Sequence, residues 1–213
     1  MDGGADPQVA GDSELTRHPS LDDRFDPSVR VVEHDPAWAV EAQQELNLIR
    51  QALGALAVRL EHVGSTSVPG LAAKPILDLQ LSVTRIEPRA RYATPLGRLG
   101  YTFIPDPDSP GYRLFAKPAT RPRTHHLHVC ESAGWHEARH LALRDYLRAH
   151  PAEADRYAAL KRDLVEIAPQ DRLSYIAGKR RYVEDLEARA LVWHGQPVTA
   201  DAWPALAGAQ HTP

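Results

Sequence analysis

The sequence of 213 residues is poor in cysteine, in aromatic side chains and in long apolar runs. Its single cysteine, Cys130, excludes an intramolecular disulfide, and no Cys/His spacing matches a structural zinc site. No stretch approaches the roughly 18 consecutive apolar residues of a membrane helix, and the first residues lack the basic region and apolar block of a signal peptide. We therefore expect a cytoplasmic protein, in which Cys130 is a half-buried strand residue and not a nucleophile.

Neither sign of charge dominates, because 25 basic and 28 acidic side chains leave a net charge of −3. This balance argues against general binding of DNA or RNA. Basic side chains nevertheless gather between residues 85 and 123, where eight of them stand against three acids. That stretch is a candidate anion-binding region, or equally a solvated face of an arginine-rich chain.

Composition divides the chain into one domain and two tails. Residues 1–28 are rich in Asp, Gly, Pro and Ser and predict a disordered N-terminal tail, and residues 196–213 predict a similar C-terminal tail. Residues 29–195 are long enough for one domain with a sizeable core.

The apolar period within this domain predicts strands that alternate with helices. We expect strands at 29–33, 57–63, 76–83, 101–104, 112–117 and 124–130, and helices at 35–53 and 88–99. From residue 134 onward the pattern is helical, and Pro151 and Pro169 divide it into helices at 134–149, 152–167 and 170–193. This order indicates an α/β (α+β) body that carries a helical C-terminal part.

The strand at 76–83 carries a carboxylate within an apolar run. Side chains alternate along a strand, so Leu79 and Leu81 belong to one apolar face, while Asp78 and Gln80 belong to the other. Burying a carboxylate is unfavourable unless it is paired or bound to a metal. Asp78 is therefore the leading site candidate, although an exposed acid on an edge strand would give the same pattern.

The loop of residues 64–75 before that strand is suited to holding phosphate, because glycine lets the backbone approach a ligand and hydroxyl and amine groups donate hydrogen bonds. It is not a P-loop, since no Gly-Lys-Ser/Thr sequence occurs and a strand follows it. The candidate phosphate groups of the loop are Gly64, Ser65, Thr66, Ser67 and Lys74.

A histidine block occupies the strand at 124–130. Alternation places His126 and His128 on one face and His125 on the other. If this strand neighbours the strand of Asp78, the two histidines have three possible roles. They are ligands for Mn²⁺, Zn²⁺ or Fe²⁺ together with Asp78, a general base for an acceptor hydroxyl or amine, or hydrogen-bonding groups in a polar cleft.

Three further basic residues are candidates for phosphate binding. Arg113 and Lys117 are four apart on one strand and share a face, and Arg123 precedes the histidine block. The planar guanidinium of arginine suits two-pronged recognition of phosphate.

The segment of residues 62–79, HVGSTSVPGLAAKPILDL, closely resembles the signature of the GrpB family, a branch of the nucleotidyltransferase superfamily with a DNA-polymerase-β-like fold. The resemblance spans about residues 29–192 and includes the segments 112–115, 125–129, 143–148 and 157–161. It implies a mixed sheet flanked by helices, and it raises Arg144, Lys161 and Lys179 as phosphate ligands.

The resemblance also implies roles for the loop and the strand acid. In the superfamily, a Gly-Ser loop holds the terminal phosphates of a nucleotide, and a strand with Asp-x-Asp/Glu binds a divalent metal, Mg²⁺ or Mn²⁺. Gly64 and Ser65 match the loop and Asp78 matches the first acid. Gln80 stands at the second acid, where an uncharged side chain is a weak ligand for Mg²⁺, so that a two-metal mechanism is in doubt.

Three functions follow from these features. The leading one is transfer of a nucleotidyl group from a nucleoside triphosphate to a small-molecule acceptor, with a divalent metal at Asp78. The second is a non-catalytic module that binds a nucleotide or a coenzyme A-related metabolite, since relatives of this domain are fused to dephospho-CoA kinase. Binding of DNA or RNA is the weakest, because aromatic residues are not interleaved with the basic stretch.

Overall fold

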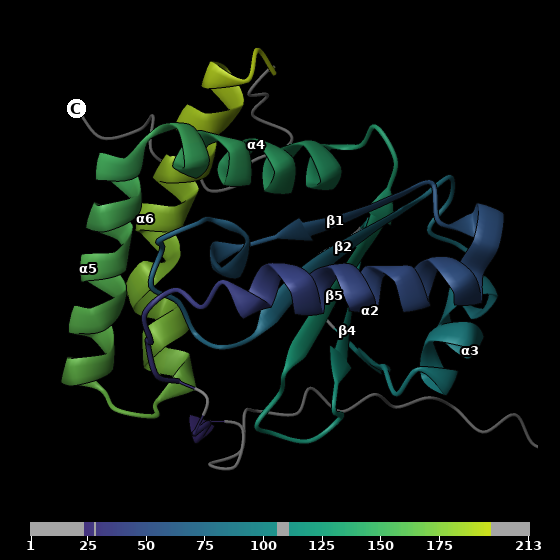
Figure 1. Ribbon diagram of the computed structural model, residues 1–213, viewed down its shortest axis with the longest axis horizontal. Coiled ribbons are helices and arrows are strands. Elements are labelled where there is room, and N and C mark those ends of the chain that lie inside the picture. Colours follow the sequence, from purple (N-terminus) through teal and green to yellow (C-terminus); the bar gives the residue numbers. More distant parts are fainter. Residues whose placement is uncertain (1–23, 28, 106–110, 197–213) are drawn as a thin grey trace, which may run out of the picture.

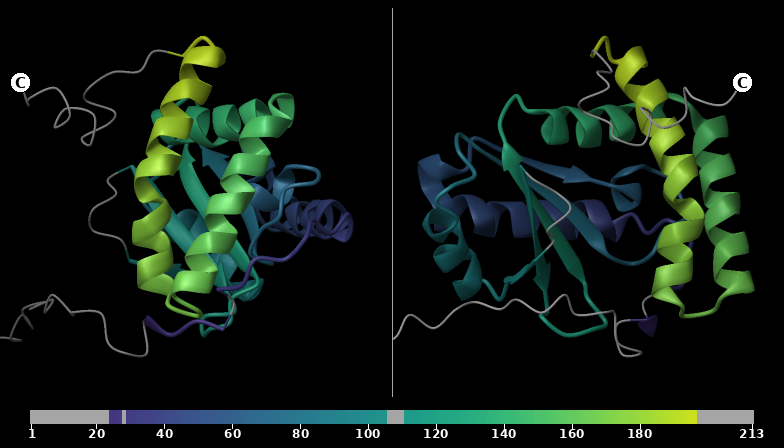
Figure 2. Two further views of the ribbon diagram at one scale, coloured as in Figure 1. Left: turned by 90° about the vertical axis from the view of Figure 1, so that its left-hand side faces the viewer. Right: turned by 180° about the vertical axis from the view of Figure 1, so that it is seen from behind.

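The computed structural model describes residues 24–27, 29–105 and 111–196, and it has two layers of helices around one sheet. Helix α2 (Ala37–Leu53) and the short α3 (Ala90–Arg98) cover one face of the sheet (Figure 1). Helices α4 (Trp135–Ala149), α5 (Pro151–Ile167) and α6 (Arg172–Trp193) form the helical C-terminal part, in which α4 packs on β1 and β5 while α5 and α6 stand at one end of the sheet (Figure 2). The predicted helices are thus confirmed.

The sheet contains strands β1 (Arg59–Val63), β2 (Leu77–Val83), β3 (Thr102–Ile104), β4 (Tyr112–Lys117) and β5 (His125–Glu131). Their spatial order is β1-β2-β5-β4-β3, and only the β2–β5 pair is parallel. The sheet is therefore mixed, as the resemblance implied. The parallel register sets Asp78 opposite His126 and Gln80 opposite His128.

The predicted strand at 29–33 is wrong. In this segment Val32 forms a single bridge with Ala73, in which each backbone N–H donates to the other residue's carbonyl at 2.9 Å. Antiparallel pairing cannot continue two residues further along the loop, because Pro75 has no N–H to donate.

Two apolar clusters hold the elements together. Trp38, Leu46 and Ile49 of α2 are buried against the apolar face of β2, as their helical spacing predicts. The second cluster joins Val68 and Leu71, in the loop before β2, to the helical C-terminal part. The loop is therefore fixed by packing between sheet and helices.

Of the described helices, none is long and apolar enough to cross a bilayer. The predicted tails fall mostly on residues 1–23, 28 and 197–213, outside the described residues. The cytoplasmic location stays a prediction.

Candidate functional site

A polar pocket of about 350 Å³ lies between the loop before β2, the first residues of β2 and β5, and helices α4 to α6. Its volume is in the range of small-molecule sites. We call it the basic pocket, because among the described residues its lining holds six lysines and arginines against two carboxylates: Lys74, Arg123, Arg144, Lys161, Arg172 and Lys179 against Asp78 and Glu187. Such an excess of positive charge in a concave surface attracts anions.

Asp78 is bound by both histidines of its face. Its Oδ1 lies 3.2 Å from Nδ1 of His126 and 3.1 Å from Nε2 of His128, and its side chain is 29% exposed. Burial opposes ionisation of Asp78, but the hydrogen bonds from the two imidazoles outweigh it and hold its pKa well below the usual range. Asp78 is therefore an anion at neutral pH, and it only accepts hydrogen bonds.

The two histidines differ in the nitrogen atom that they leave available. His126 donates through Nδ1, so its neutral form carries the lone pair on Nε2, and burial lowers its pKa further toward that form. His128 donates through Nε2, while its Nδ1 lies 2.6 Å from the hydroxyl of Tyr112. The hydroxyl of Tyr112 thus donates to Nδ1 of His128, and this nitrogen is already used as an acceptor. Between the two, His126 has the arrangement of a general base.

Gly64 lets the loop approach Asp78 closely. A Cβ atom on Gly64 would lie 2.6 Å from Oδ2 of Asp78, and the backbone has φ 67° and ψ −171°. Residues with a side chain essentially never adopt this conformation. Glycine is therefore required here, both for the turn from β1 and for the contact with Asp78.

A buried lysine supports the start of the loop. Residues Ser65–Ser67 form a 3-10 turn, η2, and Oγ of Ser65 lies 3.1 Å from Nζ of Lys161 on α5. Lys161 also donates to the carbonyl of Ala72 and is 1% exposed. Burial lowers the pKa of Lys161 to about 7 and that of Lys74 to about 8.

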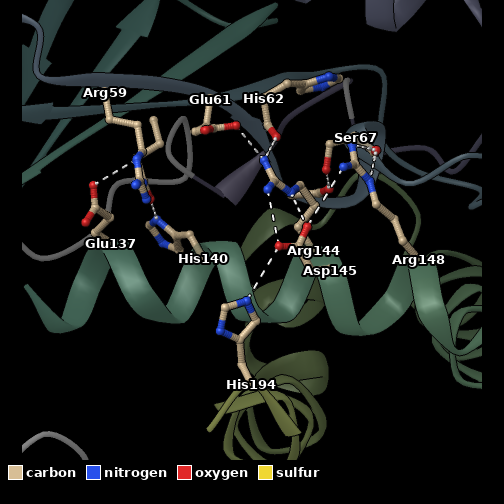
Figure 3. Close-up of polar contacts among 12 residues, drawn as sticks. Arg59, Glu61, His62, Ser67, Glu137, His140, Arg144, Asp145, Arg148 and His194 are labelled. Atoms are coloured by element: carbon tan, nitrogen blue, oxygen red, sulfur yellow. Dashed lines mark hydrogen bonds and ion pairs between the residues drawn. The ribbon is translucent and has the colours of Figure 1, made fainter. Parts of the chain in front are cut away.

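Arg144 ties α4 to β1 at the edge of the pocket (Figure 3). Its guanidinium donates to Glu61 and to Asp145, each at 2.8 Å, and to the carbonyl of His62 at 3.3 Å. One turn later on the same helix, Arg148 donates to the carbonyl of Ser67 at 2.7 Å. The charged face of α4 therefore positions β1 and the loop.

The basic pocket contains most of the predicted site residues. Its lining includes the loop residues Gly64, Ser65, Thr66 and Lys74, the strand residues Asp78, His126 and His128, and the basic residues Arg123, Arg144, Lys161 and Lys179. The helix pairs His140/Arg144 and Tyr175/Lys179 also face it. Four predicted residues do not line it.

Arg113 and Lys117 share a face of β4, as predicted, but it is the face away from the basic pocket. Leu114, between them in alternation, lines the pocket instead. Arg113 pairs with Glu87 at 2.9 Å, and Lys117 pairs with Glu45 of α2 at 2.9 Å.

The side chains of Ser67 and Gln80 are buried in the protein interior and do not line the basic pocket. The hydroxyl of Ser67 donates to the carbonyl of Gly64 at 2.6 Å. The Gln80 side chain is 0% exposed, and its Oε1 accepts from Nδ1 of His140 at 2.8 Å. Gln80 therefore supports α4 and does not reach the pocket.

These positions do not fit the predicted metal centre. Asp78 is the only carboxylate at this wall of the pocket among the described residues, and the imidazole nitrogens near it are engaged in hydrogen bonds to it. Across residues 24–27, 29–105 and 111–196, no group of three or more His, Cys, Asp or Glu side chains is placed to hold a metal ion. A site for Mg²⁺ or Mn²⁺ stays a prediction without support from the donor set.

Four residues of α6 that were not predicted, Arg172, Ile176, Val183 and Glu187, also line the pocket. With the predicted Lys179 they form a stripe at intervals of three and four residues. That spacing is visible in the sequence, and it would have indicated which face of α6 meets the site.

A second hollow, of about 440 Å³, lies on the outer side of α4 and α6 and is lined by Tyr146, Ala188, Arg189, Val192 and Trp193. Its lining is almost entirely apolar, and none of the described residues that line it is a carboxylate or a histidine. The convergent polar groups of the basic pocket make that pocket the candidate site.

Comparisons with known proteins agree on one family. The sequence model described as GrpB protein matches residues 28–189. The UPF0157 protein PA4798 of Pseudomonas aeruginosa is 39% identical over 176 residues, which are 81% of this chain and 72% of that protein. The crystal structure of conserved protein GrpB from Enterococcus faecalis superimposes with a TM-score of 0.72 at 36% identity, covering 78% of this chain and 100% of that one.

Some relatives are about twice as long as the matched region. A dephospho-CoA kinase of Mycolicibacterium paratuberculosis is 30% identical over 193 residues, which are 78% of this chain and 46% of that protein. This chain likewise covers 48% of the UPF0157 protein YqkA of Bacillus subtilis.

Proposed function

This chain belongs to the GrpB protein family, and from the geometry of its basic pocket we propose that it binds a nucleoside triphosphate there and transfers the nucleotidyl group to a small-molecule acceptor. The observation that carries the proposal is the basic character of the pocket, where six lysines and arginines stand against two carboxylates among the described residues. Phosphate groups are the common ligands of such a constellation, since each ammonium or guanidinium donates charge-assisted hydrogen bonds.

The chemistry of the proposal resides in Asp78 and His126. An acceptor hydroxyl or amine gives its proton to Nε2 of His126 as it attacks the α-phosphorus, and pyrophosphate leaves. Asp78 holds the Nδ1–H of His126 and stabilises the imidazolium that forms. The cations of the pocket neutralise the charge that develops on the phosphate oxygens.

No step of this proposal passes through a metal ion. Gln80 is directed to His140 and Asp78 is engaged by two imidazoles, so the arrangement supports charge neutralisation by lysine and arginine. Metal dependence is therefore measured separately, by comparing binding in EDTA with binding in Mg²⁺ and in Mn²⁺.

The first experiment measures the melting midpoint of the wild type with each nucleoside triphosphate, in EDTA, in Mg²⁺ and in Mn²⁺. A triphosphate at 100 times its Kd stabilises the folded state by about 2.7 kcal/mol, which is a rise of about 5–11 °C for a chain of this size. We expect this rise in EDTA. If no triphosphate raises the midpoint under any condition, the proposal is wrong.

The second experiment measures pyrophosphate release from the stabilising triphosphate with a panel of small hydroxyl and amino compounds. We expect His126→Gln to lose steady-state release while the triphosphate still raises its melting midpoint. Equal release by wild type and His126→Gln would overturn the assignment of the base. A rise that needs metal and is absent in Asp78→Ala would restore the metal role of Asp78.

One observation favours a second candidate function, a non-catalytic module for a coenzyme A-related metabolite. The chain matches part of a dephospho-CoA kinase at 30% identity over 193 residues. Stabilisation by dephospho-coenzyme A alone, with no pyrophosphate release from any triphosphate, would favour this function over transfer.

A further inference from the structure

We propose that Ser65 is a nucleophile activated by Lys161, and that it forms a transient covalent bond to phosphorus of the donor bound in the basic pocket. The inference rests on the proposed function for the identity of the donor. It replaces direct attack on the triphosphate by two successive displacements, so that the acceptor attacks the phosphorus held by Ser65. The dyad itself is testable without knowledge of the donor or the acceptor.

The geometry is that of a nucleophile with an adjacent base. Oγ of Ser65 lies 3.1 Å from Nζ of Lys161, which is within hydrogen-bond reach, and both residues line the basic pocket. Ser65 follows Gly64 directly and is the first residue of η2, and it is only partly buried. Serine–lysine pairs of this kind replace the serine–histidine pair in several enzymes.

The surroundings of Lys161 favour a neutral amine. The side chain is 1% exposed, and none of the ion pairs among the described residues joins it to a carboxylate. A neutral amine has two hydrogens and one lone pair. As an ammonium, Lys161 donates to the carbonyl of Ala72 and to Oγ of Ser65. As a neutral amine it can keep the bond to Ala72 and turn its lone pair to the hydroxyl proton of Ser65.

The groups around Lys161 act in both directions. Burial, and then Lys179 on α6 and Arg162 on α5, lower its pKa, Asp78 on β2 raises it, and together they place it at about 7. The ring of Tyr157 on α5, with its centroid 4.3 Å from Nζ, also favours the ammonium. A large fraction of Lys161 is therefore unprotonated at neutral pH. A buried lysine without a carboxylate partner destabilises a fold, so its presence beside a pocket serine points to chemistry.

The covalent step balances as follows. Oγ of Ser65 attacks the α-phosphorus of the triphosphate, an Oγ–P bond forms, and the bond from phosphorus to the pyrophosphate oxygen breaks. The Ser65 proton moves to Nζ of Lys161, which becomes an ammonium, and pyrophosphate leaves. In the second half, the acceptor oxygen or nitrogen attacks the same phosphorus, His126 takes the acceptor proton, and the proton on Lys161 returns to Oγ of Ser65.

The test uses diisopropyl fluorophosphate on the full chain, because this neutral probe reports serine nucleophilicity without requiring the donor. Attack by Oγ of Ser65 displaces fluoride and leaves a stable phosphoryl adduct, which intact-protein and peptide mass spectrometry locate. We expect a single adduct on Ser65 in the wild type and in Ser132→Ala, a control serine outside the pocket. We expect no adduct in Ser65→Ala.

The pH profile separates an activated serine from a merely accessible one. The labelling rate of the wild type should rise with pH around a midpoint near 7, as Lys161 loses its proton. Lys179→Met removes a neighbouring positive charge and should move that midpoint upward, while Lys161→Met should lose at least tenfold in rate. Since Lys161→Met removes a buried group and its folding is at risk, the Lys179→Met shift provides the independent check.

Three results would overturn the inference: labelling of the wild type no faster than that of the unfolded chain, an adduct that maps elsewhere, or a rate that is the same from pH 5 to pH 9. Failure of the proposed function is a different result, namely no stabilisation by any triphosphate. A labelled Ser65 without triphosphate binding would keep the dyad and discard the donor.

Discussion

Gly64 offers the sharpest test of how the loop and the strand acid fit together. Substituting alanine places a Cβ 2.6 Å from Oδ2 and 2.8 Å from Cβ of Asp78, closer than atoms of this kind approach. The same change forces a side chain into φ 67°. Gly70→Ala is the matched control, because Gly70 has φ 79° but a Cβ there would have nothing within 4 Å.

The expected loss of unfolding free energy differs between the two variants. Backbone strain at Gly64 costs about 1–3 kcal/mol, and overpacking against Asp78 costs about 1–3 kcal/mol more. The sum is a loss of about 2–6 kcal/mol for Gly64→Ala. Gly70→Ala carries the strain alone, about 1–2 kcal/mol. The lower chain entropy of the unfolded state is common to both substitutions and cancels in the comparison.

Urea unfolding, followed by tryptophan fluorescence and extrapolated linearly to water, measures both free energies. The contact between Gly64 and Asp78 predicts that Gly64→Ala unfolds at a clearly lower urea concentration than Gly70→Ala. If the two variants lose the same stability, Asp78 does not lie against Gly64, and the geometry of the pocket wall is wrong.

Three further predictions concern Asp78, Cys130 and Arg144. Since the hydrogen bonds from His126 and His128 depress the folded pKa of Asp78, its contribution to stability is complete above its unfolded pKa of about 3.9, declines as the pH falls below that value and disappears only below the folded pKa. The gap in unfolding free energy between wild type and Asp78→Asn should therefore shrink from pH 6 to pH 3, and a constant gap would contradict the pairing. Burial raises the pKa of the Cys130 thiol to about 12, so an aromatic disulfide reagent should react only after unfolding, and rapid reaction with the native chain would refute its burial. Arg144→Met removes hydrogen bonds to two carboxylates and should lower the free energy of unfolding by about 1.5–3 kcal/mol, which urea titration measures; an unchanged midpoint would show that these bonds do not stabilise α4 against β1.

The spacing of polar and apolar residues correctly predicted which side chains share a face of one strand or one helix. The alternation along β2 separates Asp78 from the buried Leu79, and the same rule places His126 beside His128. Helical spacing predicted the core face of α2 for the same reason. These are local properties, because each depends on the backbone geometry of one element.

Which face meets the pocket depends on tertiary placement, and there the predictions for Arg113, Lys117 and Gln80 were wrong. Arg113 and Lys117 do share a face of β4, but the pairing of Leu114 with His128 turns that face toward α2 and α3. Gln80 lies on the correct side of β2, yet His140 of α4 binds its amide oxygen. No period within one strand reveals where a helix 60 residues later will pack.

Calorimetric titration with ATP in EDTA measures whether lysines and arginines of the basic pocket bind phosphate. We expect one molecule to bind per chain and Lys74→Met to weaken binding about tenfold or more, as loss of a charge-assisted hydrogen bond does. Arg113→Met, outside the pocket, should bind as the wild type does. Equal affinity of wild type and Lys74→Met, or an Arg113→Met defect as large as that of Lys74→Met, would show that phosphate is not bound by the lysines and arginines of the basic pocket.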